Sequence, residues 1–267
     1  MTRRTRPSVG PRLPAAVLLA VLTATQLVPP GQAASAASCT GRPVLLVHDF
    51  AGTSATLAPV ADALRADRRC PVLVDHGAGG LLALVGLGGL ASLDQSAPQV
   101  GLAIDRTAQG RKGRSVDVVA YGAGSLATLR TLQASALRRA RVHSFVAIGG
   151  LWDGTNLAGL GGLDRLSRDV GSYDTVLAVE KLVLDPVCAV CRELISHSDF
   201  LNALRARGLR TPGIRRVDVV STDDVLVQPF SSGVAPGSRA IVVTGVNHLL
   251  LPRSAAVTRA VRSALTP

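Results

Sequence analysis

The sequence predicts an α/β fold, with a mostly parallel central sheet covered by helices on both faces. Six short segments rich in valine and other apolar residues fit buried strands, and segments with helical spacing lie between most of them. Strands that are apolar on both faces are typical of parallel sheets, which need helices on each side. Hydrophobic residues make up 47% of the chain and charged residues 18%, which excludes a wholly disordered protein.

The predicted elements follow one another from residue 43 to residue 264. The strands are Pro43–Val47, Pro71–Val74, Val116–Ala120, Val142–Ile148, Val217–Ser221 and Ala240–Thr244. The helices are Thr53–Ala66, with Thr53 or Ser54 as N-cap, Ala97–Gln109, Ser125–Arg139 and Ser254–Ala264. The Gly- and Leu-rich segment Gly77–Gly89 fits a buried loop, a flap over a site or a broken helix, and the sequence does not decide among them.

Residues 1–38 have the layout of a secretory signal peptide. Four arginines precede an apolar stretch, Leu13–Val28, which Pro29-Pro30-Gly31 and a run of small residues follow. We expect cleavage near Ala36, at Ala34-Ser35-Ala36, and a mature domain over residues 39–267. The apolar stretch is short for a membrane anchor, and no run long enough to span a bilayer follows it. Lipidation of Cys39 is a minor alternative.

The formal net charge is +11, and it falls to +7 once the four arginines of the first 38 residues are removed. The remaining basic residues are scattered, and no aromatic residues lie among them to stack on bases. We therefore expect a solvated basic surface, no nucleic-acid partner and no stable membrane span.

An exported chain meets an oxidising compartment, where four cysteines favour two disulfides. Three pairings are open, and the preferred one joins Cys39 to Cys70 and Cys188 to Cys191. The Cys-x-x-Cys pair could instead be a redox motif, but no thioredoxin-like context surrounds it. We expect no metal, because no paired histidines lie near the cysteines, and no cofactor.

Polar residues gather where the predicted strands end, which is where parallel sheets carry their sites. The strand Val116–Ala120 runs straight into a Gly-rich turn and a helix, the geometry of a nucleophile elbow. Asp224 follows a later strand, with Asp223 beside it as an alternative acid, and His248 lies near the C-terminus. Elbow, acid and histidine therefore come in the order used by α/β-hydrolases.

Most of residues 39–267 resemble the secreted triacylglycerol lipases and esterases of the α/β-hydrolase superfamily, of the type common in actinobacteria. The resemblance rests on Arg42–His48 with Phe50, Gly52–Pro59, Val116–Val119, Gly154–Leu160, Cys188–Cys191 with Ser198–Leu201, Asp224–Phe230 and Asn247–Leu249. It implies hydrolysis of carboxylic esters of lipids. It also implies an Asp224–His248 pair, and oxyanion donors at the backbone N–H groups of Phe50 and Ala123.

The chain departs from this family at the elbow. Members read Gly-His-Ser-Gln-Gly there, whereas this chain reads Ala120-Tyr121-Gly122-Ala123-Gly124, which puts Gly122 at the nucleophile position. Glycine has no hydroxyl to attack an ester. Asp49 replaces a family glycine and would oppose an oxyanion if it points inward, and Asp153 stands where the family often has histidine. On the sequence alone, Gly122→Ser should restore a nucleophile, and adding Asp49→Gly should raise its rate.

Two other interpretations of the elbow are weaker. Ser125 could substitute as nucleophile, but it lies roughly 5 Å further along the helix axis and also fits a helix-capping serine. Gly122–Ala127 matches a dinucleotide fingerprint, yet the next strand does not end in an acid. Two functions remain: a weak or repurposed ester hydrolase acting on a lipid or small ester, and a non-catalytic homologue that binds lipid or an unknown partner protein.

Overall fold

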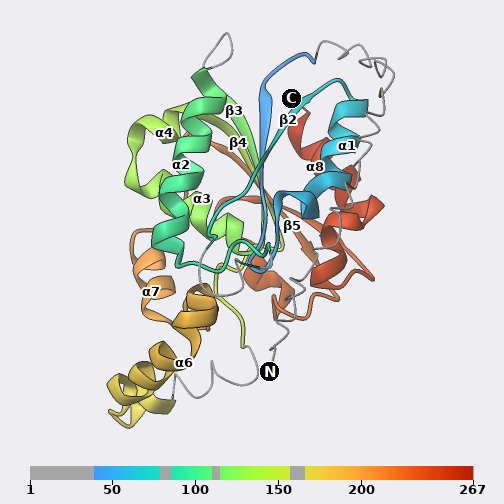
Figure 1. Ribbon diagram of the computed structural model, residues 1–267. Coiled ribbons are helices and arrows are strands. Elements are labelled where there is room, and N and C mark those ends of the chain that lie inside the picture. Colours follow the sequence, from blue (N-terminus) through green and yellow to red (C-terminus); the bar gives the residue numbers. More distant parts are fainter. Residues whose placement is uncertain (1–38, 79–83, 85, 110–114, 157–165, 267) are drawn as a thin grey trace, which may run out of the picture. The chain divides into compact units, whose positions relative to one another are not determined.

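The computed structural model describes residues 39–78, 84, 86–109, 115–156 and 166–266 (Figure 1). The predicted signal peptide and residues 79–83 and 85 of the undecided Gly77–Gly89 segment lie outside that range. Residues 38–267 cluster as one compact unit. Among the described residues, none of the helices is both long and apolar enough to cross a bilayer.

Six parallel strands form one sheet in the order β2-β1-β3-β4-β5-β6, which confirms the predicted fold class. Their bounds are β1 Pro43–Val47, β2 Cys70–Val74, β3 Val116–Tyr121, β4 Val142–Ile148, β5 Arg215–Ser221 and β6 Arg239–Val243. All residues of β1 and β3 are buried, as expected for strands inside a sheet covered on both faces. Pro71, which cannot donate a backbone hydrogen bond, lies in the edge strand β2.

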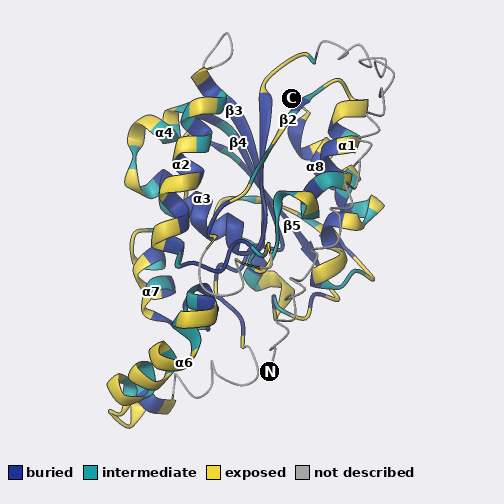
Figure 2. Ribbon diagram, in the orientation of Figure 1, coloured by how far each residue is buried: buried dark blue, intermediate teal, exposed yellow. Residues whose placement is uncertain are grey.

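Helices cover both faces of the sheet (Figure 1). On one face, α2 (Leu93–Gln109) and α3 (Ala123–Ala134) pack on side chains such as Leu45, Val118 and Phe145. On the other, α1 (Ala58–Ala66) and α8 (Ala255–Leu265) pack on the alternate residues, such as Leu46 and Val146. Figure 2 shows the sheet buried between these two layers. Successive side chains of a strand point to opposite faces of the sheet, so the two faces pack into two separate hydrophobic cores.

Several helices differ from their predicted bounds. The segment over Thr53–Ala66 divides into the 3₁₀ turn η1 (Ser54–Leu57) and α1, with Pro59 in the first turn of α1. Helix α2 begins four residues before Ala97, and its first N–H, that of Leu93, donates to Glu193 Oε2 at 2.6 Å. The helix over Ser125–Arg139 begins at Ala123 and is broken at Ser135, which caps α4 (Ala136–Arg141).

Further helical elements among the described residues are α6 (Tyr173–Glu193), α7 (Asp199–Ala206), η4 (Phe230–Gly233) and η5 (His248–Arg253). Sequence reasoning missed α6 and α7. In α6, Pro186 and the non-helical Cys188 interrupt the helical pattern, and apolar side chains face solvent. The cysteines pair as preferred from the sequence, Cys39 with Cys70 and Cys188 with Cys191, each with 5.3 Å between Cα atoms.

Candidate active site

Four loops that follow the carboxyl ends of strands meet at one edge of the sheet. The loop after β1 carries Asp49 and Phe50, and the turn after β3 carries Gly122 and Ala123. Asp224 follows β5, and His248 follows β6. Parallel strands bring such loops together, because all their carboxyl ends lie at the same edge. The structure thus brings together the acid, the histidine and the two backbone donors that the sequence singled out.

Gly122 forms the sharp turn between β3 and α3. Its φ of +50° and ψ of −122° lie in a region that residues with side chains rarely adopt. Its N–H donates to the carbonyl of Ile148, and its own carbonyl accepts from the N–H of Ser125, both at 3.0 Å. The backbone of a nucleophile elbow is therefore present without the nucleophile.

The carboxylate of Asp49 fills the space beside Gly122. A Cβ built on Gly122 would lie within 3.0 Å of Cγ and of both carboxylate oxygens of Asp49. Oδ1 accepts from the N–H of Phe50 at 2.7 Å and from the N–H of Ala123 at 2.6 Å. The two predicted oxyanion donors therefore share one acceptor, which belongs to the protein itself. Asp49 is 3% exposed, so this carboxylate is almost wholly enclosed.

His248 bridges two carboxylates. Its Nδ1 lies 2.7 Å from Asp224 Oδ2, and its Nε2 lies 3.2 Å from Asp49 Oδ2. Asp224 is held in place, because its Oδ1 accepts from the N–H groups of Leu226 and Val227. Burial alone would lower the pKa of His248, but hydrogen bonds to Asp224 and Asp49 and their negative charges raise it to about 9. At neutral pH the ring is an imidazolium that donates to both carboxylates.

Two buried histidines support the loop that carries Asp49. The rings of His48 and His76 stack with centroids 4.3 Å apart, and His76 Nε2 lies 2.9 Å from the carbonyl of His48. His48 Nδ1 lies 2.7 Å from the carbonyl of Asp49, while its Nε2 accepts from the N–H of His76. Burial lowers the pKa of His48 and brings that of His76 to about 4, so both rings are neutral at neutral pH. The sequence around His76 shows no pattern that indicates a partner, so its contact with this loop could not be predicted.

Three further residues from the sequence lie apart from this cluster. Ser125 is buried in the first turn of α3, where its hydroxyl donates to the carbonyl of Ala120 at 3.1 Å, and Gly122 rather than Ser125 is the N-cap. Asp153 forms an exposed ion pair with Arg205, so its departure from the family pattern does not bear on the site. Asp223 points away from His248, because its carboxylate accepts from Thr222 and from the N–H of Gly245.

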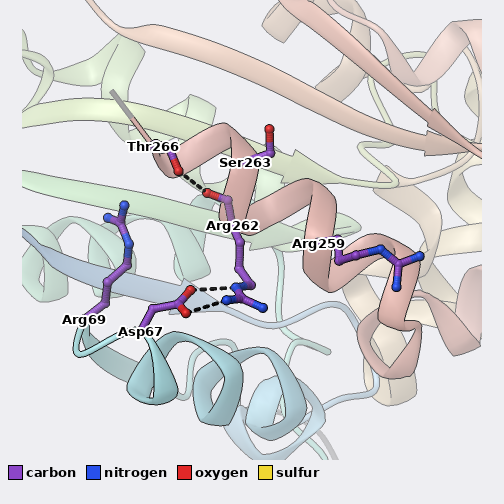
Figure 3. A pocket seen from close by; sticks show the side chains of 6 residues that line it. All are labelled: Asp67, Arg69, Arg259, Arg262, Ser263 and Thr266. Atoms are coloured by element: carbon purple, nitrogen blue, oxygen red, sulfur yellow. Dashed lines mark hydrogen bonds and ion pairs between the residues drawn. The ribbon is translucent and has the colours of Figure 1, made fainter.

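A cationic hollow of about 410 Å³ lies elsewhere, between α8 and the start of β2 (Figure 3). Arg262 and Asp67 form a bidentate ion pair across it, with N–O distances of 2.6 and 2.5 Å. Because Asp67 precedes β2, the hollow belongs to the amino ends of the strands and not to the site. Within the described ranges, no group of three His, Cys, Asp or Glu side chains is placed to hold a metal ion.

The arrangement has the geometry of a triad in which a carboxylate takes the place of the serine hydroxyl. Asp224 orients His248 and favours its protonated form. His248 faces Asp49, and the Asp49 carboxylate accepts from two converging backbone N–H groups. A group in that place can accept hydrogen bonds and can act as a nucleophile toward carbon. It cannot release a proton to the imidazolium as a serine hydroxyl does to a neutral histidine.

The search against family models returned no match, and neither did the search of curated proteins. Solved structures do match. The mature form of a Bacillus licheniformis lipase is 13% identical with a TM-score of 0.62, over 85% of this chain and 92% of that one. Lipase B of Aspergillus fumigatus is 17% identical with a TM-score of 0.56, over 79% of this chain. This chain spans about half of that lipase, 49% of its length.

An extracellular α/β-hydrolase from a Paenibacillus species is 13% identical with a TM-score of 0.52, over 84% of this chain and 99% of that one. Together with the parallel six-stranded sheet, these likenesses show that the chain has the α/β-hydrolase fold found in lipases and esterases. At such low identity they show the fold alone.

Proposed function

We propose that this α/β-hydrolase-fold chain is a secreted relative of lipid ester hydrolases, of the actinobacterial type, in which serine-type ester hydrolysis is lost. One observation carries the proposal: the Asp49 carboxylate fills the space of a side chain at position 122 and accepts from the N–H groups of Phe50 and Ala123. A single side chain therefore takes both the nucleophile position and the oxyanion donors.

Serine-type hydrolysis needs three things at this site, and each is missing. Gly122 supplies no hydroxyl. The ester carbonyl would need the N–H donors that Asp49 already occupies, and it would meet a negative charge beside them. His248, whose pKa is raised to about 9, has no free ring nitrogen at neutral pH to accept a proton. We therefore expect negligible turnover of carboxylic esters.

The test uses the purified mature chain with a short-chain nitrophenyl ester and a serine-directed phosphonate. We expect no turnover and no covalent label in the wild type. The matched repair is Asp49→Gly with Gly122→Ser, compared with each single variant, and we expect the label only in the double variant. Robust wild-type turnover that is lost in His248→Ala, or a wild-type label removed by Ser125→Ala, would contradict the proposal.

A second candidate, a non-catalytic lipid-binding module, is favoured by the exposed face of α6. Val179, Leu182 and Val183 share one side of this helix by their spacing, and Leu182 is 79% exposed. Co-sedimentation with vesicles of neutral and anionic phospholipid tests it. Leu182→Asp should abolish binding, while the exposed Leu137→Asp on α4 serves as a control that leaves it unchanged. Equal binding of both variants would contradict this candidate.

The proposal of secretion draws support from the leader layout of residues 1–38 and from the two cysteine pairs. We expect the protein recovered from culture medium to begin just after Ala36. N-terminal sequencing checks this. A chain that begins with a lipid-modified Cys39 and stays with the membrane fraction would show anchoring instead.

A further inference from the structure

We infer that Asp49 is a nucleophile toward alkyl electrophiles, molecules in which an sp³ carbon carries a leaving group, and that His248 and Asp224 serve the hydrolysis of the ester so formed. The inference goes beyond the proposed function, because it gives the same site a different reaction once serine chemistry is lost. It rests on how the two oxygens of Asp49 are held. Oδ1 is fixed by two backbone N–H groups, and Oδ2 faces His248 Nε2 at 3.2 Å.

The first step is displacement at carbon. Oδ2 supplies an electron pair to the alkyl carbon, the bond from that carbon to its leaving group breaks, and the leaving group departs with the bonding pair. For an alkyl halide the product is free halide. For an epoxide it is an alkoxide on the same molecule, which takes a proton from water. Asp49 is then an alkyl ester, and its carbonyl oxygen, Oδ1, stays on the N–H groups of Phe50 and Ala123.

The second step is hydrolysis of that ester. Water attacks Cγ of Asp49 while His248 Nε2 takes one of its protons. The negative charge that develops on Oδ1 lies where the N–H groups of Phe50 and Ala123 already point. The intermediate collapses by expelling the alkoxide, which takes the proton from His248 and leaves as an alcohol. The carboxylic acid left on Asp49 then gives its remaining proton to His248 Nε2, which has just become neutral. This restores the imidazolium and the carboxylate, and one of the carboxylate oxygens now derives from water.

His248 changes its protonation between the two steps for an electrostatic reason. The Asp49 carboxylate is one of the two groups whose hydrogen bond and charge raise the pKa of this histidine. Alkylation removes the charge of Asp49 and leaves only Asp224 to oppose the effect of burial. The pKa of His248 therefore falls once the ester forms, so that the ring can lose its proton and act as the base for the second step.

The surroundings indicate an apolar substrate. The loops that carry the acid and the histidine also expose large apolar side chains: Val225 is 54% exposed, and Leu249 is 70% exposed. Each is the immediate chain neighbour of a site residue, Asp224 or His248. Exposed apolar side chains on the loops that carry a site favour a hydrocarbon ligand over a charged one.

The test treats the purified mature chain with hexyl bromide and, separately, with hexene oxide, followed by mass spectrometry of the intact chain and its peptides. In His248→Gln, which keeps a hydrogen-bonding side chain but cannot take the proton, we expect a stoichiometric alkyl adduct on the peptide that holds Asp49. Asp49→Asn should lose the adduct completely. Asp223→Asn, a matched change at an exposed carboxylate, should leave it unchanged. The probe that reacts identifies the leaving-group class.

The wild type supplies a readout that needs no variant. Turnover in heavy-oxygen water should place heavy oxygen in the Asp49 carboxylate during the first cycle, since water attacks Cγ. Heavy oxygen found only in the product alcohol would overturn the inference, because water would then attack the substrate directly. An adduct that survives Asp49→Asn, or no adduct and no turnover with either probe, would also overturn it. If the protein reacts with neither the nitrophenyl ester nor the alkyl probes, this inference is contradicted and the proposed function is not. If it hydrolyses the ester through a serine that the phosphonate labels, the proposed function is contradicted and this inference is not.

Discussion

Serine at position 122 tests directly whether Asp49 occupies the space of the missing nucleophile. Gly122→Ser places a Cβ within 3.0 Å of the carboxylate carbon and both oxygens of Asp49. Asp49 cannot move aside without losing its bonds to the N–H groups of Phe50 and Ala123 and its contact with His248. The sequence alone predicts that this substitution restores a nucleophile. The structure corrects that expectation, because the single variant overfills the site.

The expected cost follows from three contributions. Overpacking an enclosed site costs about 1–3 kcal/mol. A side chain at a φ of +50° adds about 1–3 kcal/mol. Displacing a buried carboxylate from its donors adds about 1–3 kcal/mol. Gly122→Ser should therefore destabilise the fold by about 3–9 kcal/mol, a large part of a typical domain stability of about 5–15 kcal/mol.

Adding Asp49→Gly removes the overlap and leaves the backbone strain, so the double variant should be more stable than Gly122→Ser alone. Urea unfolding of both single variants and the double variant measures this coupling, which should be about 1–3 kcal/mol in favour of the pair. The phosphonate should label only the double variant. If Gly122→Ser alone has the same urea unfolding midpoint as the wild type and takes the phosphonate label, Asp49 does not occupy this space and the reasoning is wrong.

Three other predictions concern stability. The pKa of His248 is raised from 6.5 to about 9, so its stabilisation is complete below pH 6.5 and is lost as pH rises to about 9, by about 3 kcal/mol. Urea unfolding at several pH values should show this fall, and His248→Gln should flatten it. Burial raises the pKa of Glu193 to about 7, so its ionisation destabilises the fold as pH rises from 4.5 to 7. Glu193→Gln should therefore raise the urea midpoint at pH 8 but not at pH 4, and equal shifts at both would contradict the reasoning. Replacing Cys39 and Cys70 with serine opens a link between residues 31 apart and should cost about 3–4 kcal/mol by loop-closure entropy. An unchanged thermal midpoint under non-reducing conditions would show that this bridge contributes little.

The strands and the cysteine pairs could be predicted because their signals are local. A valine-rich run such as Val142–Ile148 reads as a buried strand in any context, and the cysteine count limits the pairings to three. The order of elbow, acid and histidine along the chain likewise indicated which loops meet. The structure brings Asp224 and His248 to hydrogen-bond distance, as that order suggests, and excludes Asp223 through its own partners.

The position of the Asp49 carboxylate could not be predicted, because it depends on contacts across 74 residues of chain to Ala123 and 199 residues to His248. The sequence indicated only that a carboxylate pointing inward would oppose an oxyanion. Asp153 shows the opposite error: its family position suggested a place in the site, but an ion pair with Arg205 holds it at the surface. A side chain's direction is set by tertiary packing, which sequence order does not record.

Gly122 and Asp49 are best understood as one coupled change rather than two separate losses. Asp49 fits only where residue 122 has no side chain, since any Cβ there would overlap its carboxylate. Removal of a nucleophile alone would leave two N–H donors and a histidine converging on an empty position, and buried polar groups without partners are costly. Here both donors and the imidazolium converge on the carboxylate of Asp49. A polar network satisfied in this way is rigid and keeps His248 oriented by Asp224, so the site retains the positioning that a carboxylate nucleophile needs.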